Sequence, residues 1–172
     1  MTDDAEVRAI DHLDTDRYLG QWFEIGRLPL RWEPEGARDI TAHYSANDDG
    51  TIRVDNRCID GTGEPTQSVG RAKQSGEKTS ELSVSFLPEF LRWIPFTEGD
   101  YWVLRIDDDY AHSLVGTPDR KNLWLLARTP QVDAAVADSY LETARSMGFD
   151  LSDWIVPEQS GRIVSDAQLQ SA

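Results

Sequence analysis

Most of the chain follows a two-residue alternation of apolar and polar positions. In residues 51–58, the side chains of Ile52, Val54, Asn56 and Cys58 share one face, and the residues between them are threonine or charged. A period of two is typical of a strand with one buried face. Turn-forming segments such as 47–50 (NDDG) separate consecutive runs. The pattern predicts antiparallel strands at about residues 21–27, 39–45, 51–58, 67–73, 82–86, 101–106, 111–115 and 122–128.

A helical period replaces the alternation after residue 128. The apolar stripe with this spacing comprises Val132, Val136, Tyr140, Ala144 and Met147. Thr129 suits the N-cap, Pro130 the first helical position and Gly148 the C-terminal cap. These features predict one helix whose apolar stripe packs on the outside of the sheet.

Consecutive antiparallel strands favour closure into a barrel, because closure removes exposed sheet edges. The predicted fold class is therefore all-β: an eight-stranded antiparallel up-and-down barrel with one C-terminal α-helix packed outside. We expect the barrel and helix to occupy residues 13–157, with flexible polar tails at 1–12 and 158–172. A barrel of this size either holds one small ligand or is filled by its own side chains.

Three short motifs occur in order along the predicted strands. The first is 18–25 (YLGQWFEI), the second is 106–110 (IDDDY), and the third is 127–130 (ARTP). The segment 115–120 (VGTPDR) leads into the last strand. Together these motifs resemble those of the lipocalin family, and in particular its bacterial, apolipoprotein D-like branch. The resemblance covers about residues 13–157.

The resemblance implies a closed-end motif made of Gly20, Trp22 and Arg128. In the family the tryptophan plugs the closed end of the barrel, and the arginine lies across its ring. A guanidinium over an indole face gains about 0.5–2 kcal/mol of cation–π energy. The resemblance also implies a protein that binds, stores or transports a fatty acid or a lysophospholipid. The residues by themselves indicate only an apolar ligand.

The alternation assigns one face of each strand to the inside of the barrel. The predicted ligand-binding wall comprises Ile40, Ala42, Tyr44, Val54, Asn56, Val84, Phe86, Tyr101, Val103, Trp124 and Leu126. Tyr101 and Val103 are assigned by the resemblance, because both faces of their strand are apolar. This choice also turns Arg105 inward, toward Glu24 or a ligand headgroup, unless the assumed alternation fails.

Two connections at the predicted open end, residues 28–32 and 87–96, are apolar and contain proline. Clustered apolar loops indicate either an interaction surface or a self-buried cap. The predicted portal residues are Trp32, Phe90, Leu91, Trp93 and Arg120. On the first interpretation they admit the ligand and contact a membrane or a second copy of the chain. On the second, these side chains fold inward and close the barrel.

Charge and reactive residues exclude several other functions. A net charge of −14 disfavours nucleic acid, whose phosphates need cationic partners. His12, His43 and His112 are isolated, so the sequence predicts no metal site, and we find no cofactor motif. The single cysteine, Cys58, allows no disulfide within the chain. We therefore predict that the protein is not an enzyme.

Two alternatives to a carrier stay open. One is a small lipid-acting enzyme that uses Cys58, or Arg105 with Glu24, in the same cavity. The other is a docking module with a filled barrel and an apolar mouth. No signal peptide is visible before residue 13, so the chain as written is expected in the cytoplasm. The family resemblance also allows the periplasm or the outer membrane.

Overall fold

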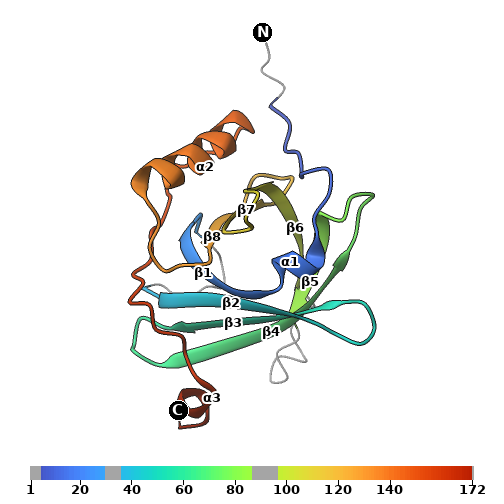
Figure 1. Cartoon of the computed structure of the whole chain (residues 1–172). Coiled ribbons are helices and arrows are strands. Elements are labelled where there is room, and N and C mark those ends of the chain that lie inside the picture. Colours follow the sequence, from blue (N-terminus) through green and yellow to red (C-terminus); the bar gives the residue numbers. More distant parts are fainter. Residues whose placement is uncertain (1–4, 30–35, 87–96, 172) are drawn as a thin grey trace.

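The computed structural model describes residues 5–29, 36–86 and 97–171. The elements in chain order are α1 (Thr15–Tyr18), β1 (Gly20–Arg27), β2 (Arg38–Ala46), β3 (Ile52–Ile59), β4 (Pro65–Gln74), β5 (Glu81–Phe86), β6 (Thr97–Ile106), β7 (His112–Gly116), β8 (Leu123–Ala127), α2 (Ala134–Ser146) and α3 (Asp166–Ser171). Figure 1 shows α2 outside the ring of strands and α1 within the ring in this view. None of the helices in the described ranges is long and apolar enough to cross a membrane.

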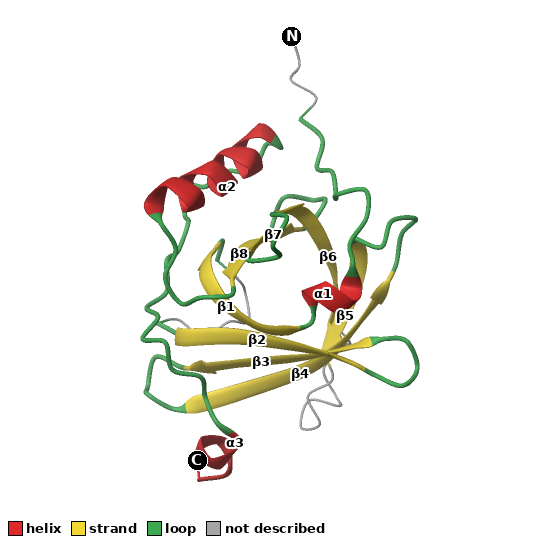
Figure 2. Ribbon diagram, viewed as in Figure 1, coloured by secondary structure: helices red, strands yellow, loops and turns green. Residues whose placement is uncertain are grey.

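The strands form one closed barrel in the order β1 to β8, with β8 pairing back onto β1 (Figure 2). Every neighbouring pair is antiparallel, so the predicted up-and-down barrel is confirmed. Directly paired residues share a face, and Trp22 lies opposite Ala42 while Glu24 lies opposite Leu126. One apolar cluster fills the inside of the barrel, and a second lies between the barrel and α2.

A bulge in β6 decides which of its side chains face inward. Tyr101 and Val103 pack in the interior cluster, and the register with β7 shifts between Val103 and Arg105. Arg105 instead stacks on the ring of Tyr140 in α2, 4.0 Å from the ring centroid. The expectation that Arg105 follows Tyr101 and Val103 inward is wrong, because an extra residue in a strand reverses the alternation beyond it.

Part of the outer face of the barrel is covered by α2, as the sequence predicts (Figure 1). Tyr140 and Ala144 are buried there, in the same cluster as Leu104, Leu114 and Leu125. The predicted apolar stripe is therefore the packing face of the helix.

The two ends of α2 differ in how well the sequence places them. The helix starts at Ala134, after Asp133, and not at Pro130. The Thr129 hydroxyl donates to the carbonyl of Gln131 and caps no helix. At the other end Gly148 has φ +86°, and the amides of Gly148 and Phe149 donate back to the last turn. This termination requires a left-handed residue, so the predicted glycine cap is confirmed.

The chain ahead of β1 closes one end of the barrel. Asp14 caps α1 by accepting a hydrogen bond from the amide of Arg17. Leu13 and Tyr18 are buried in the interior cluster. Residues 5–12, expected as part of a flexible tail, lie against the barrel, where the Ile10 amide donates to the carbonyl of Val103.

The C-terminal segment completes the wall between β1 and β2. These strands pair directly only over residues 20–23 of β1. Farther along, Ile155 bridges Arg27, and Gln159 Nε2 donates to one carbonyl of β1 and one of β2, at 2.8 and 2.9 Å. The segment 158–172, expected as a second flexible tail, thus contacts the barrel through part of its length.

Candidate ligand-binding site

The closed end of the barrel is built on Trp22 and Arg128. Trp22 is 0% exposed, and the Arg128 guanidinium carbon lies 3.9 Å from the centroid of its ring. The indole Nε1 donates to the carbonyl of Tyr18 at 2.9 Å, which satisfies the only polar atom of the ring. The cation–π pair that the resemblance implies is therefore present in the structure.

Arg128 also holds the surrounding backbone together. Its guanidinium donates to the carbonyls of Arg17, Leu19, Gln21 and Tyr110 at 2.8 to 3.0 Å. Gly20, with φ +103°, makes this approach possible, because a β-carbon there would lie 3.3 Å from Arg128 Nη1. The motif is a structural closure, because four of the five N–H groups of Arg128 donate to backbone carbonyls around Trp22.

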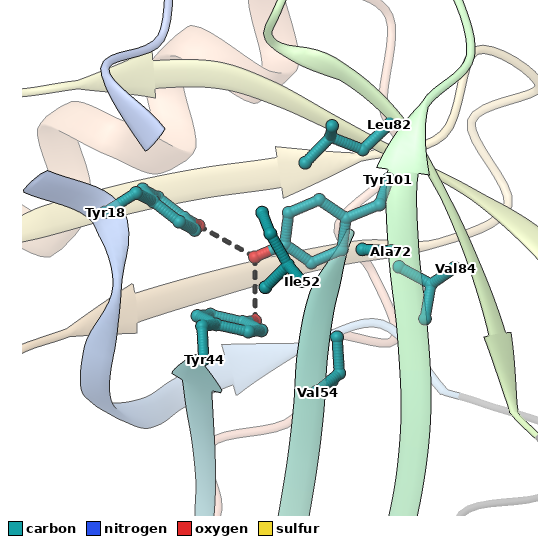
Figure 3. Close-up of a pocket in the computed structure, with 8 residues that line it drawn as sticks. All are labelled: Tyr18, Tyr44, Ile52, Val54, Ala72, Leu82, Val84 and Tyr101. Atoms are coloured by element: carbon teal, nitrogen blue, oxygen red, sulfur yellow. Dashed lines mark hydrogen bonds between the residues drawn. The ribbon is translucent and has the colours of Figure 1, made fainter. Parts of the chain in front are cut away.

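Three tyrosines lie directly inside this closure (Figure 3). The hydroxyl of Tyr101 is 2.7 Å from that of Tyr18 and 2.8 Å from that of Tyr44. The Tyr18 hydroxyl is also 2.9 Å from Ser113 Oγ. The four oxygens form a chain of hydrogen bonds that starts on β2 and ends on β7. Each of the four oxygens takes part in at least one of these hydrogen bonds, as is usual for polar atoms inside an apolar interior.

The phenols of this chain stay neutral. Burial raises the pKa of Tyr18 to about 12 and raises the pKa values of Tyr44 and Tyr101 well above the ordinary value. Each hydroxyl therefore keeps its proton at physiological pH and can donate one hydrogen bond.

A cavity of about 10 Å³ remains beside the tyrosines. Its other lining residues come from β3, β4 and β5: Ile52, Val54, Ala72, Leu82 and Val84. This volume is about enough for one water molecule. Apart from this space, side chains fill the closed half of the described interior, and an acyl chain has no room to extend there.

The inner wall farther from α1 is partly accessible instead. Asn56, Phe86 and Trp124 lie on the inner face, and each is partly exposed. Gly70 leaves space for the Phe86 ring, since a β-carbon there would lie 2.8 Å from Phe86 Cδ1. Gly99 faces open space, with no atom within 4 Å of where its β-carbon would be. The accessible side chains of the described inner wall therefore include Asn56, Phe86 and Trp124, in the half farther from α1.

A buried ion pair interrupts this apolar wall. Glu24 lies opposite Leu126 and follows Trp22 onto the inner face by the alternation of β1. A bulge after Glu24 turns Arg27 onto the same face, opposite Trp124. Arg27 Nη1 is 3.2 Å from Glu24 Oε2, and each residue is 4% exposed. Such a pair is costly to bury and requires close geometric complementarity.

The structure brings most of the predicted wall residues together. Those that belong to the interior cluster or pack against it are Ala42, Tyr44, Val54, Val84, Phe86, Tyr101, Val103, Trp124 and Leu126. Asn56 pairs with Ala42 on the same face. Ile40 packs in a separate small cluster with Ala37 and Cys58. Contact of any of these side chains with a ligand stays a prediction.

Of the five predicted portal residues, Arg120 alone lies within the described part of the chain. Trp32, Phe90, Leu91 and Trp93 lie outside the described residues, so their role stays a prediction from sequence. Arg120 is held elsewhere, since its Nε donates to the Met147 carbonyl at 2.7 Å and its Nη2 donates to the carbonyl of Ala5. Its guanidinium joins the end of α2 to the N-terminal segment, which does not support a place at the mouth.

The geometry offers little support for the enzyme alternative. Arg105 and Glu24 lie on opposite faces of the barrel wall, so they cannot act together on one substrate. Cys58 Sγ is 3.0 Å from Thr66 Oγ1. Within the described residues no group of three or more histidine, cysteine, aspartate or glutamate side chains could hold a metal ion.

The wall prediction omitted several interior residues, among them Ile52, Ala72 and Leu82, which line the cavity beside the tyrosines. Tyr18 and Ser113 belong to the hydroxyl chain, and Arg27 belongs to the ion pair. Ser113 could have been found by extending the alternation of β7. Tyr18 and Arg27 could not, because one lies on a helical turn and the other lies beyond a bulge.

Comparisons with known proteins agree with this geometry. The family model "Lipocalin-like domain" matches residues 13–159. Temperature-induced lipocalin-1 of Arabidopsis thaliana is 41% identical over 155 residues, which cover 88% of this chain and 82% of the plant protein. Outer membrane lipoprotein Blc of Escherichia coli (strain K12) is 39% identical over 157 residues, covering 90% and 84%. The solved structure of insecticyanin from the tobacco hornworm Manduca sexta superposes with a TM-score of 0.69 at 19% identity, covering 95% and 87%.

Proposed function

Because the chain belongs to the lipocalin family, we propose that its barrel binds one small hydrophobic molecule, a fatty acid or a lysophospholipid, for storage or transport. The observation that carries this proposal is the contrast within the interior. Partly exposed, mainly apolar side chains line the open half, whereas packed side chains fill the closed half. Ligand pockets are built in this way, with an apolar wall and a few polar groups.

The size of the hydrophobic contribution suits a lipid tail. Each buried methylene contributes about 0.8 kcal/mol, so several methylenes against Phe86 and Trp124 offset the entropy lost on association. We infer that the tail lies along these two rings and that a charged headgroup stays toward the open end.

Tryptophan fluorescence provides the test. We expect palmitate and a lysophosphatidylcholine, added separately, to change the emission with a dissociation constant in the micromolar range. Trp124→Phe removes the inner-face indole and abolishes most of the change. Trp102→Phe is the matched control, because Trp102 packs in the cluster outside the barrel. If the emission never changes and native mass spectrometry detects no bound lipid, the proposal is rejected.

The place of action is a separate proposal. The similarity to outer membrane lipoprotein Blc supports a role beside a membrane of the cell envelope, where a carrier would exchange lipid. A mouth that contacts the membrane or a second copy of the chain would suit this role. Replacing Phe90 and Trp93 by serine is expected to weaken binding to lipid vesicles, as measured by co-sedimentation.

A further inference from the structure

We infer that the ligand enters with an uncharged oxygen at its leading end, which accepts a hydrogen bond from the tyrosine chain at the floor of the barrel. This inference rests on the proposed function, because it specifies which lipids the same cavity prefers. It concerns the end of the ligand that reaches Tyr44 and Tyr101, and not the headgroup at the mouth.

The starting point is a count of protons in the hydroxyl chain. Tyr44, Tyr101, Tyr18 and Ser113 contribute four hydroxyl protons, and the chain contains three hydrogen bonds. Each hydrogen bond uses one proton. One hydroxyl proton is therefore left over whichever way the chain is oriented. Among the described residues these hydroxyls make no further hydrogen bond.

In three of the four possible orientations of the chain the unused proton lies on a tyrosine, and in the fourth it lies on Ser113, outside the cavity lining. Tyr18, Tyr44 and Tyr101 all line the cavity, and its remaining walls are aliphatic. A buried donor without an acceptor costs about 1–3 kcal/mol, a tendency that holds for hydroxyls as for amides. The cavity of about 10 Å³ can take one oxygen atom as an acceptor, supplied either by a water molecule or by the end of a ligand.

The leading group is uncharged because the floor of the barrel has too few hydrogen-bond donors to stabilise an anion. A buried carboxylate needs several hydrogen bonds or a partner cation, and the chain supplies a single spare donor. Arg128 does not compensate, since its guanidinium lies on the Trp22 ring and donates to four backbone carbonyls. The Glu24 carboxylate on the inner wall further disfavours a second negative charge. A hydroxyl or keto oxygen needs only one donor.

The matched probes are palmitate and ω-hydroxypalmitate, which differ by one oxygen at the end remote from the carboxylate. We expect the wild-type protein to bind ω-hydroxypalmitate at least as tightly as palmitate. In an ordinary apolar pocket the added hydroxyl would weaken binding, because it loses its hydrogen bonds to water. The readout is the ratio of the two dissociation constants, measured by isothermal titration calorimetry.

The test variant is the triple substitution Tyr18→Phe, Tyr44→Phe and Tyr101→Phe. If Tyr18 were kept, its hydrogen-bonded pair with Ser113 would still hold one unused proton, and Tyr18 lines the cavity. Ser113, the hydroxyl that stays, is not among the residues that line the cavity. We expect the ratio to move about tenfold in favour of palmitate in this variant. Tyr140→Phe is the matched control, because it removes a phenol oxygen from the cluster outside the barrel, and its ratio should equal that of the wild type.

The outcomes separate this inference from the proposed function. An equal ratio in wild type and triple variant, with both fatty acids bound, overturns the inference and leaves the carrier function intact. If the wild type binds neither fatty acid, both fail.

A second measurement does not depend on the variant folding. A fatty acid with a keto group next to its terminal methyl, bound to the wild type, should show a ketone infrared stretch at lower frequency than in hexane. An unshifted ketone band overturns the inference.

Discussion

The closed and open halves of the barrel interior use similar side chains in different ways. In the closed half, Trp22, Tyr18 and Tyr44 are buried, and their polar atoms make hydrogen bonds within the protein. In the open half, Phe86 and Trp124 face the same interior but are partly exposed. An aromatic residue on an inner face can therefore serve either as packing or as a surface for a ligand.

The difference comes from what lies beyond each half. α1 and the Arg128 guanidinium cover the closed end and satisfy the polar groups there. In the open half, the Glu24–Arg27 ion pair lies on the inner wall. The C-terminal segment contacts the backbone of the same two residues through Gln159 and Ile155. Stability should therefore depend mainly on the closed half, and ligand affinity mainly on the open half.

The largest expected effect separates the two tryptophans. Trp22→Ala should lower the free energy of unfolding by about 3–5 kcal/mol, because it leaves a cavity and removes the cation–π partner of Arg128. Trp124→Ala should cost about 1–2 kcal/mol, since this ring is already partly exposed. Urea denaturation of both variants measures the contrast, and equal losses would show that the two halves do not differ in this respect.

The buried ion pair comes next in size. Arg27→Met leaves the Glu24 carboxylate buried without its Arg27 partner and should cost about 3 kcal/mol. The double substitution Glu24→Leu with Arg27→Met should recover most of this loss, because apolar side chains of similar volume often replace such pairs. Thermal unfolding monitored by circular dichroism tests the prediction. A double variant less stable than Arg27→Met would contradict it.

A smaller effect is expected at the β1–β2 wall. Gln159→Ala removes the donor shared by one carbonyl of each strand and should lower stability by about 1–2 kcal/mol. Gln170→Ala, at an exposed glutamine of α3, is the control and should change stability by less than about 0.5 kcal/mol. Amide hydrogen exchange in β1 and β2 beside Gln159 should become faster only in Gln159→Ala. Equal exchange in both variants would show that the C-terminal segment does not hold these two strands together.

The smallest effect distinguishes a tyrosine inside the barrel from one outside it. The Tyr140 hydroxyl is buried under α2 and makes no hydrogen bond within the described structure. Tyr140→Phe should therefore leave stability within about 0.5 kcal/mol of wild type, or raise it. Tyr101→Phe breaks two hydrogen bonds and should cost about 1–2 kcal/mol. Similar values for both in urea denaturation would contradict the role of the hydroxyl chain.

The sequence predicted the strands, the closure and the outer helix because each depends on a local period. The alternation in residues 51–58 has one solution, with Ile52 and Val54 inside, and the pairing with β4 reproduces it. The start of α2 was misplaced because, judged from the sequence alone, Thr129 and Pro130 suit a helix start as well as Asp133 and Ala134 do. Arg105 was misplaced because a bulge leaves no mark in a strand that is apolar on both faces.

By itself, the sequence determined an eight-stranded barrel with an outer helix and the absence of a disulfide within the chain, and its resemblance to the lipocalins implied the pairing of Trp22 with Arg128. Only the tertiary structure decided that three tyrosines from α1, β2 and β6 share one hydroxyl chain, and that Glu24 and Arg27 face the same interior. The reason is physical: periodicity reports which face of an element is buried, whereas hydrogen bonds between distant elements depend on register, bulges and the packing of a short helix across the barrel end.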